Sequence, residues 1–416
     1  MNNYKNREKF NEIIKLINIP EIIVLHGARQ VGKTTLMKMT MDYLKEGGID
    51  DIFYFDLEQE EFLNLFNQGL EEVVKYINGR KNKNRQGGRK SKTFVFVDEV
   101  QYLDNPTSIL KLFYDHYKDD FKLIVSGSSS FAIKSKFSDS LVGRIIDLEI
   151  FGLSFYEFLD FKGLRYDLTS DSDLICSELK NIYTEYVLYG SYPQVVLTDN
   201  LELKETYLKS IIEKYIYKDI KDLAEVKDLE KFNNLVKFLA SQAGELVNVN
   251  ELSDTLNIAR QTVEQYLFIL ESTYIIKLVR PYHKNIRSEL SKMSKIYFED
   301  LGILNLLRNK KLISDIDGHV FENSVYSYLR RRFNVSDLYF WRTANKQEVD
   351  FVVSGQRIVP IEVKLSYQDK LVKNLNYFSE QYKVKESYCI TMNKKISKFN
   401  NIQQIYPWGI EVLRVN

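Results

Sequence analysis

A glycine-rich stretch near the N-terminus has the residue types and the spacing needed to bind phosphate groups. It runs from Gly27 to Thr35 and follows an apolar run at 22–25. In the pattern G-x-x-x-x-G-K-[ST], loop N–H groups surround phosphate oxygens, and the next helix adds the positive end of its dipole. We expect Lys33 to contact the terminal phosphates of ATP and the Thr34 hydroxyl to bind Mg²⁺; an ordinary glycine-rich turn is the alternative. The residues expected to bind the nucleotide are Gly27, Ala28, Arg29, Gln30, Val31, Gly32, Lys33, Thr34 and Thr35.

Two adjacent carboxylates provide the second part of the expected site. Asp98 and Glu99 follow the apolar run 94–97, which predicts a strand buried on both faces. In open α/β sheets, ligands bind at the carboxyl ends of the strands. We expect Asp98 to hold Mg²⁺ through water and Glu99 to polarise the attacking water, so that ATP is hydrolysed and not only bound. An acidic pair at a strand end also arises by chance.

A serine and an arginine downstream complete the expected phosphate chemistry. The apolar run 121–125 leads into a serine-rich loop, where Ser128, or else Ser126, could sense the terminal phosphate. Arg144 precedes the apolar alternation 145–150 and could stabilise charge on the transferred phosphoryl group, within its own subunit or in a neighbouring one. The alternatives are an ordinary serine-rich loop and a structural salt bridge.

A second group of charged residues lies in the last third of the chain. The segment 348–365 reads as a β-hairpin, and because side chains alternate along a strand, Glu362 and Lys364 share one face. Asp350 lies across the hairpin, so Asp350 and Glu362 could share Mg²⁺ or Mn²⁺, with Glu322 from the preceding helix completing the metal site. Lys364 would then lie beside the attacking water or the developing phosphate charge. A surface hairpin with an exposed Glu–Lys pair is the alternative.

The length and composition describe a chain of several domains. Its 416 residues exceed one ordinary core, and 44% hydrophobic with 28% charged residues is typical of globular proteins. With a net charge of +1, contact with nucleic acid would depend on local patches. No apolar run approaches the ~20 residues that span a bilayer, and no signal peptide is evident, so we expect a cytoplasmic protein without membrane contact. The two separated cysteines, Cys176 and Cys389, agree with a reducing compartment.

Helices and strands between these groups would position them. Apolar spacing predicts a helix at 4–18, a helix from Leu36 to Leu44 and a strand at 52–55. A basic run from Gly79 to Thr93 reads either as a solvated loop or as an arm that contacts phosphates. Residues 201–243 have a helical pattern with tyrosines and isoleucines on a core-facing side.

The segment 249–279 predicts a winged helix–turn–helix. It reads as two helices with a tight turn, followed by a β-wing at 274–279. The start of the second helix would read DNA base edges, although Glu264 and Glu271 reduce the positive charge of that face. Packing against protein is the alternative role of such a module. The residues placed to contact bases are Arg260, Gln261, Thr262 and Gln265.

These motifs together resemble a prokaryotic AAA-type ATPase family that is related to the STAND and archaeal-ATPase groups. The resemblance matches Glu99 to the extra catalytic glutamate of those groups. The family's helical lid carries a glycine–glycine–aromatic–proline signature, which stands here at 190–193 with Ser191 in place of the second glycine. The resemblance also implies sites between subunits and therefore a homo-oligomer such as a ring. The segments that carry it are 27–35, 94–99, 126–129, 141–144 and 153–159.

The C-terminal hairpin resembles the PD-(D/E)xK, restriction-endonuclease-like fold. Asp350, Glu362 and Lys364 form the motif, and Val349 stands where its proline would be. The same ATPase family commonly ends in such a domain, so the resemblance covers nearly the whole chain. The implied fold class is α/β, with a P-loop NTPase parallel sheet. The expected domains are an AAA-type P-loop ATPase core at 1–150, a helical lid at 151–230, a winged helix–turn–helix at 231–312 and a restriction-endonuclease-like α/β domain at 313–416.

The expected function is that of a Mg²⁺-dependent, AAA-type ATPase whose C-terminal region acts on DNA by binding, remodelling or cleavage. The expected partners are ATP, DNA and further copies of the chain. The alternative is a nucleotide-controlled, STAND-like switch in which the winged helix and the nuclease-like domain only bind partners. A third interpretation is a defence or mobile-element factor whose nuclease is held off until ATP or a trigger acts.

Overall fold

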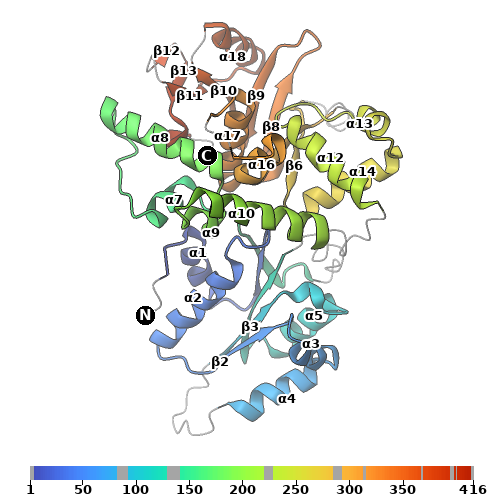
Figure 1. The fold of residues 1–416 in the computed structure, drawn as a ribbon. Coiled ribbons are helices and arrows are strands. Elements are labelled where there is room, and N and C mark those ends of the chain that lie inside the picture. The colour runs from blue at the N-terminus through green and yellow to red at the C-terminus, as the bar shows by residue number, and fades with distance from the viewer. Residues whose placement is uncertain are drawn as a thin grey trace. The chain divides into compact units, whose positions relative to one another are not determined.

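The computed structural model describes residues 4–81, 92–128, 141–219, 228–283, 293–312, 315–366, 369–393, 398–399 and 401–413. Its contacts divide the chain into two compact units, and each is described by itself below (Figure 1). The first is Met1–Leu153 with Ser272–Tyr274, and the second is Ser154–Glu271 with Ile275–Asn416. Within the described ranges, no helix is long and apolar enough to cross a membrane.

A parallel sheet forms the centre of the first unit (Figure 1). The strand order is β2-β3-β4-β1-β5, and every pair of neighbours is parallel. Because all carboxyl ends then lie at one edge, the residues that follow β1, β3 and β4 meet there. The predicted parallel sheet is confirmed. The strands are β1 Ile22–His26, β2 Ile52–Asp56, β3 Thr93–Asp98, β4 Phe121–Gly127 and β5 Ile145–Glu149.

Continuous apolar runs explain why the central strands of this sheet form. Strands β3 and β4 are buried at every position, as expected for strands that are covered on both faces. Val73, Ile77 and Phe113 from the helices belong to one buried hydrophobic cluster with Val95 and Val97 of β3, and burial of each such side chain contributes ~1.5–3 kcal/mol. The helices are α1 Glu8–Leu16, α2 Lys33–Glu46, α3 Glu60–Asn67, α4 Leu70–Arg80 and α5 Pro106–Tyr117, with the 3₁₀ helix η1 Val100–Tyr102.

The second unit starts with a series of helices. The predicted helical pattern at 201–243 corresponds to α10, the π-helical segment η3 that continues it, and α12, while residues 220–227 lie outside the described ranges. In the first unit, the basic run 79–93 is described only at its two ends, because residues 82–91 also lie outside the described ranges. The helices are α7 Phe155–Phe161, α8 Asp173–Tyr189, α9 Pro193–Val196, α10 Leu201–Ile211, η3 Ile212–Asp219, α12 Leu229–Ser241, α13 Val249–Leu256, α14 Arg260–Ser272, α16 Leu301–Asn309, α17 Gly318–Arg332 and α18 Asp369–Tyr382.

The lid signature at 190–193 has a physical explanation in its contact with Asp300. Gly190 has a φ of 81°, and a Cβ there would lie 2.5 Å from Asp300 Oδ1. The backbone N–H and the hydroxyl of Ser191 donate to Asp300 Oδ2 at 2.8 and 2.9 Å. Serine at this position therefore adds a hydrogen bond to a buried carboxylate, which a second glycine would not make.

A small antiparallel sheet follows helices α12, α13 and α14. Strands β6 Ile276–Val279 and β7 Lys295–Phe298 pair with Ile276 opposite Phe298 and Val279 opposite Lys295. Two helices and a two-stranded sheet in this order are what the winged helix–turn–helix interpretation requires. That interpretation stays a prediction, because the pairing alone does not identify the module.

A mixed sheet forms the C-terminal part of the second unit, in the order β12-β13-β11-β10-β9-β8. The predicted hairpin is present as β9 and β10, which are antiparallel with Phe351 opposite Ile361. Continuing this register by one position on each strand brings Asp350 toward Glu362. Strand β10 is parallel to β11 on its other side. The strands are β8 Leu338–Arg342, β9 Glu348–Ser354, β10 Ile358–Ser366, β11 Ser387–Asn393, β12 Lys398–Phe399 and β13 Ile402–Ile405, and the short helices are η4 Val335–Asp337 and η5 Pro407–Val412.

We expect Gly27→Ala to lower the stability of the first unit by ~3 kcal/mol or more. Gly27 has a φ of 151°, and a Cβ there would lie 2.1 Å from the carbonyl oxygen of Ile150, which is backbone and cannot give way easily. The measurement is the thermal unfolding temperature. The control is Gly79→Ala in α4, where nothing lies within 4 Å of an added Cβ and alanine has the higher helix propensity. Equal unfolding temperatures for the two variants would contradict the close approach.

Candidate functional site

The loop between β1 and α2 has the backbone of an anion-binding loop. Gly27, Gln30 and Gly32 have positive φ angles of 151°, 62° and 101°, which glycine adopts without the clash of a Cβ. Gly32 is the N-cap of α2, and it has no side chain that could bond the first N–H groups of that helix. The first N–H groups of α2 therefore face the loop and not a capping side chain, as a phosphate site requires.

Lys33 lies inside this loop. Its ammonium group donates to the carbonyl oxygens of Gly27 at 3.0 Å and Ala28 at 2.9 Å. The side chain is 4% exposed, and this burial lowers the pKa of Lys33 to about 8, although the Glu99 and Asp98 carboxylates act in the opposite direction. The lysine is therefore held by neutral acceptors, and an anion placed at the loop would stabilise its charged form.

Arg7 supports the loop from the segment before α1. Its guanidinium donates to the carbonyl oxygens of Val31 at 2.8 Å and Phe151 at 2.9 Å, and the side chain is buried. A Cβ on Gly32 would lie 2.9 Å from Arg7 Nη1. Arg7 thus fixes the loop beside the start of α2. Sequence reasoning missed it, because a single arginine before a helix carries no signal of a partner 24 residues away.

Asp98 joins the loop to the sheet. Its Oδ2 atom accepts hydrogen bonds from the Thr34 hydroxyl at 2.6 Å and the Tyr54 hydroxyl at 2.9 Å, and its Oδ1 accepts from Ser126. The structure thus brings together Thr34 and Asp98, the two residues expected to hold Mg²⁺. Burial, and then the Asp98 carboxylate, raises the pKa of Tyr54 well above its ordinary range. The register of β2 on β3 places Tyr54 opposite Phe96, and nothing in the sequence of β2 distinguishes this tyrosine.

The oxygen ligands at this edge fit Mg²⁺. Across the described ranges, no three or more His, Cys, Asp or Glu side chains are arranged to hold a metal ion. Mg²⁺ does not require such a group, since it is usually held by one or two protein oxygens together with phosphate oxygens and water. One hydroxyl and one carboxylate, from Thr34 and Asp98, are a matching set.

Glu99 stands directly after β3 in an unusual backbone conformation. Its φ and ψ of 59° and 50° are left-handed, which costs a non-glycine residue free energy and often marks a functional position. Its N–H donates to Ser126 Oγ at 3.2 Å, and its carboxylate accepts from the Gln101 amide. The same amide nitrogen donates to Ser128 Oγ at 3.1 Å. Gln101 therefore connects the expected catalytic carboxylate to Ser128, which is fully buried.

Arg144 forms an ion pair in this structure. Its Nε and Nη2 atoms lie 2.7 and 3.2 Å from the two carboxylate oxygens of Asp115 in α5. This is the salt bridge that the sequence left open as the alternative to a role in phosphoryl transfer. The bidentate contact raises the pKa of Arg144 and lowers that of Asp115, with the hydrogen bond as the first cause of each.

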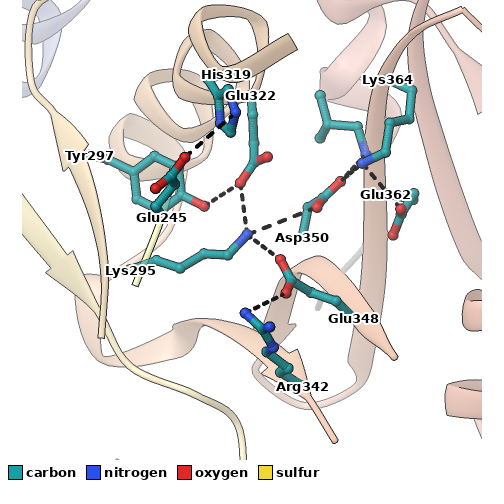
Figure 2. Close-up of polar contacts among 11 residues, drawn as sticks. Glu245, Lys295, Tyr297, His319, Glu322, Arg342, Glu348, Asp350, Glu362 and Lys364 are labelled. Carbon is teal, nitrogen blue, oxygen red and sulfur yellow. Dashed lines mark hydrogen bonds and ion pairs between the residues drawn. The ribbon is translucent and has the colours of Figure 1, made fainter. Parts of the chain in front are cut away.

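A second cluster of charged side chains lies in the second unit (Figure 2). Lys364 Nζ on β10 lies 2.8 Å from Asp350 Oδ2 and 3.2 Å from Glu362 Oε1. The backbone N–H of Val363 also donates to Asp350 Oδ2 at 2.8 Å. The residues of the Asp–Glu–Lys motif thus meet as the hairpin predicted, and all but Lys364 are nearly fully buried.

Lys295 enters the same cluster from β7. Its Nζ lies 3.0 Å from Glu322 Oε1 and 2.6 Å from Glu348 Oε1 (Figure 2). Burial lowers the pKa of Lys295, but Glu322 and the other carboxylates outweigh this effect, and the pKa lies above its ordinary value. Burial also raises the pKa of the Glu322 and Glu362 carboxyls.

The expected metal group of Glu322, Asp350 and Glu362 stays a prediction. These carboxylates do face one another, but Lys295 and Lys364 lie between them, and no metal-binding arrangement is found in the described ranges. The physical reason is that buried carboxylates need counter-charges, and the chain supplies ammonium groups. Sequence reasoning missed Lys295 because it is a single lysine at the start of the short apolar run 296–298, and its partners Glu322 and Glu348 lie far along the chain.

The start of α14 carries the residues that were expected to contact DNA. Arg260, Gln261 and Gln265 are exposed, and Thr262 is half-buried. Arg260 Nε lies 3.0 Å from Glu264 Oε1 on the next turn. The glutamate therefore neutralises the arginine locally, as its position in the sequence suggested.

Protein-family models match three successive parts of the chain. Residues 20–159 match an AAA domain. Residues 180–313 match a domain of unknown function (DUF8612), and residues 317–410 match another domain of unknown function (DUF4143). The first unit thus contains an AAA-type ATPase domain, and its parallel sheet fits the α/β fold of a P-loop NTPase. The expected AAA-type domain is confirmed at the level of this match and of the fold, and ATP hydrolysis stays a prediction.

The similarity of this chain to other proteins extends well beyond the part that matches the AAA domain. An uncharacterized protein of Haemophilus influenzae is 26% identical over 390 residues, which are 91% of this chain and 92% of the relative. An uncharacterized protein of Methanocaldococcus jannaschii is 26% identical over 367 residues, which are 86% of this chain and 78% of the relative. Among solved structures, Cdc6p from Pyrobaculum aerophilum has a TM-score of 0.32 and 11% identity, over 75% of this chain and 98% of that one.

We expect the contribution of Lys33 to the stability of the nucleotide-free protein to rise between pH 8 and pH 10.5, and Lys33→Met to remove this contribution. The pKa of Lys33 in the folded protein is about 8, below its ordinary value of 10.5. Between these two pH values the unfolded chain binds more protons than the folded protein, so the free energy of unfolding increases as the pH rises. The effect is ~3 kcal/mol for one such lysine.

Urea unfolding at pH 7.5, 9 and 10 measures this effect. Lys38→Met is the matched control, because Lys38 lies on the same helix and is exposed. Lys122, whose pKa burial lowers to about 7, is present in all variants and does not affect the comparison. If the free energy of unfolding of wild type and of Lys33→Met changed with pH in the same way, this would contradict a lowered pKa of the buried Lys33.

Proposed function

We propose that this protein is a Mg²⁺-dependent ATPase that uses the loop 27–35 to bind ATP and the end of β3 to hydrolyse it. The observation that carries the proposal is the 2.6 Å contact between Thr34 in the loop and Asp98 at the strand end. This contact supports the proposal because it joins the loop 27–35 to the residues that end β3, at one edge of the parallel sheet. The match of residues 20–159 to an AAA domain supports the same conclusion.

The roles of the residues follow from their positions. The loop N–H groups and Lys33 would bind the phosphate oxygens of ATP, and the Lys33 ammonium would exchange its carbonyl partners for them. Thr34 and Asp98 would hold Mg²⁺, which when bound neutralises charge on the phosphate oxygens. Tyr54 and Ser126 orient the Asp98 carboxylate through hydrogen bonds.

Glu99 would act as the base toward water. Its carboxylate would take a proton from the water that attacks the terminal phosphorus, and the bond to the bridging oxygen of ADP would break. In the structure this carboxylate is bound by the Gln101 amide, which also contacts Ser128. Ser128 would therefore act on Glu99 through Gln101 as well as on the phosphate itself.

We expect Glu99→Gln to reduce the ATP hydrolysis rate ~10²–10³-fold while leaving the affinity for ATP within about threefold, because the amide cannot accept the proton. Lys33→Ala should instead lose ATP binding. Turnover and equilibrium binding of labelled ATP measure the two effects. Glu58→Gln, which changes an exposed glutamate of the same unit, is the control. Unchanged turnover in Glu99→Gln would refute the assigned base, and unchanged ATP binding in Lys33→Ala would refute the site.

The output that we propose is DNA binding through the start of α14. The supporting observation is the exposure of Arg260, Gln261 and Gln265 on one helix. A nucleotide-controlled switch that binds a protein partner is the second candidate. It is favoured by the Lys295 ammonium within the carboxylate cluster, because an ion-paired cluster is not arranged for metal-dependent DNA cleavage.

If α14 binds DNA, Arg260→Ala should weaken binding and Glu264→Gln should strengthen it, each by ~5–10-fold, since the second change removes a carboxylate that pairs with Arg260. Fluorescence anisotropy with a labelled duplex at fixed salt measures this. Lys75→Ala, which breaks an exposed ion pair with Glu72 in α4, is the control. Absence of binding, or equal effects of all three variants, would favour the switch.

A further inference from the structure

A contact between a histidine and a tyrosine lies directly beside the phosphate loop. His26 is the last residue of β1, and Gly27 follows it. The His26 Nδ1 atom and the Tyr274 hydroxyl lie 2.5 Å apart, and the two rings stack with their centroids 6.0 Å apart and an interplanar angle of 26°. Both side chains are half-buried. The roles proposed for the first unit use neither residue, although His26 directly precedes the loop 27–35.

Tyr274 belongs to a short segment whose contacts are with the first unit. Residues 272–274 are grouped with that unit, whereas the residues on both sides of them belong to the second. The contact between His26 and Tyr274 therefore lies within the first unit. The two residues are 248 positions apart in the chain, so no local pattern in the sequence predicts that they meet.

The backbone of Tyr274 has a conformation that favours glycine. Its φ is 58°, which is left-handed and costs an aromatic residue free energy. The N–H of Ile275 donates to the carbonyl oxygen of Leu270 at 3.0 Å, so α14 ends in a Schellman motif with Tyr274 at the position that is usually glycine. Glycine would end this helix at a lower cost. We therefore infer that the tyrosine side chain has a use, and His26 is a partner of that side chain.

The contact reaches the phosphate loop through the backbone of His26 and Gly27. The carbonyl oxygen of His26 accepts from the N–H of Ile150 at 2.7 Å, so the His26 backbone is fixed to the segment after β5. The next carbonyl oxygen, that of Gly27, accepts from Lys33 Nζ at 3.0 Å. Ile150 thus holds the backbone of His26, and Tyr274 holds its side chain. A shift of His26 would displace Gly27 and with it an acceptor that holds Lys33.

We propose that Tyr274 is a positioning residue of the ATP site, which holds the start of the loop 27–35 through the side chain of His26. This inference rests on the proposed binding of ATP by that loop. Tyr274 acts on the loop and not on the reacting atoms. Its contact therefore supports the bound ground state and the transition state alike, so its loss raises KM and leaves kcat nearly unchanged.

Tyr274→Phe and His26→Leu each remove the hydrogen bond and should weaken ATP binding by ~5–10-fold, with kcat within about twofold of wild type. His26→Asn keeps a polar side-chain atom near the position of Nδ1 and should restore most of the affinity. Equilibrium binding of labelled ATP and steady-state turnover by the full-length protein measure these effects. Tyr43→Phe is the matched control, because Tyr43 lies on α2 of the same unit and is 48% exposed.

Tyr274→Gly separates positioning of the loop from a purely structural role at the end of α14. Glycine suits the Schellman position, so this variant should unfold at or above the temperature of Tyr274→Phe. It should nevertheless bind ATP at least as weakly as Tyr274→Phe, because it also lacks the contact with His26. If Tyr274 served only to end the helix, Tyr274→Gly would bind ATP like wild type, and this result would overturn the proposal.

Amide hydrogen exchange in the nucleotide-free protein tests the inference without ATP. The peptide that covers residues 27–35 should exchange at least ~3-fold faster in Tyr274→Phe and His26→Leu than in wild type or Tyr43→Phe. A wild-type protein that binds no ATP would refute the proposed ATPase, and this comparison would still decide whether Tyr274 holds the loop. Unchanged exchange of the peptide in both variants would overturn the inference in either case.

Discussion

The hydrogen bond from the Thr34 hydroxyl to Asp98 joins the two segments on which the proposed chemistry of the first unit depends. It is possible because β1 and β3 run parallel within one sheet, with β4 between them, so the loop after β1 and the carboxylate that ends β3 reach the same edge. Asp98 also accepts hydrogen bonds from Tyr54 in β2 and Ser126 in β4. A carboxylate tied to strands on both sides cannot shift independently of the sheet, and this gives the site a rigid frame.

Two buried lysines show how one chemical group is used in opposite ways in the two units. Lys33 is bonded by neutral carbonyl oxygens, and burial lowers its pKa to about 8. Lys295 is surrounded by carboxylates, which outweigh burial and raise its pKa. The first lysine therefore lacks a counter-charge from its immediate partners and is suited to an external anion. The second already has its counter-charges within the fold.

The phosphate loop, the acidic strand end and the C-terminal hairpin could be predicted because each is a short pattern within one segment. Gly27 to Thr35, Asp98 with Glu99, and the Glu362–Lys364 pair need no knowledge of distant residues. Their partners could not be predicted in this way. Tyr54 reaches Asp98 across 44 positions and Lys295 reaches Glu322 across 27, and such contacts depend on strand order and register, which local patterns do not determine. Gln101 is the exception, since it lies two residues from Glu99 and could have been suspected from its closeness to the carboxylate.

The position of Lys295 also bears on how the second unit is divided. The segment that matches one family of unknown function ends at residue 313, and the segment that matches the next begins at 317. The lysine belongs to the first segment, whereas Glu322, Glu348 and Asp350 belong to the second. A C-terminal fragment that begins at this border would contain Glu322, Glu348 and Asp350 without Lys295. The upstream fragment would contain Lys295 without these carboxylates. The two segments therefore share one electrostatic centre, and exchange of either for an unrelated sequence requires a compensating change in the other.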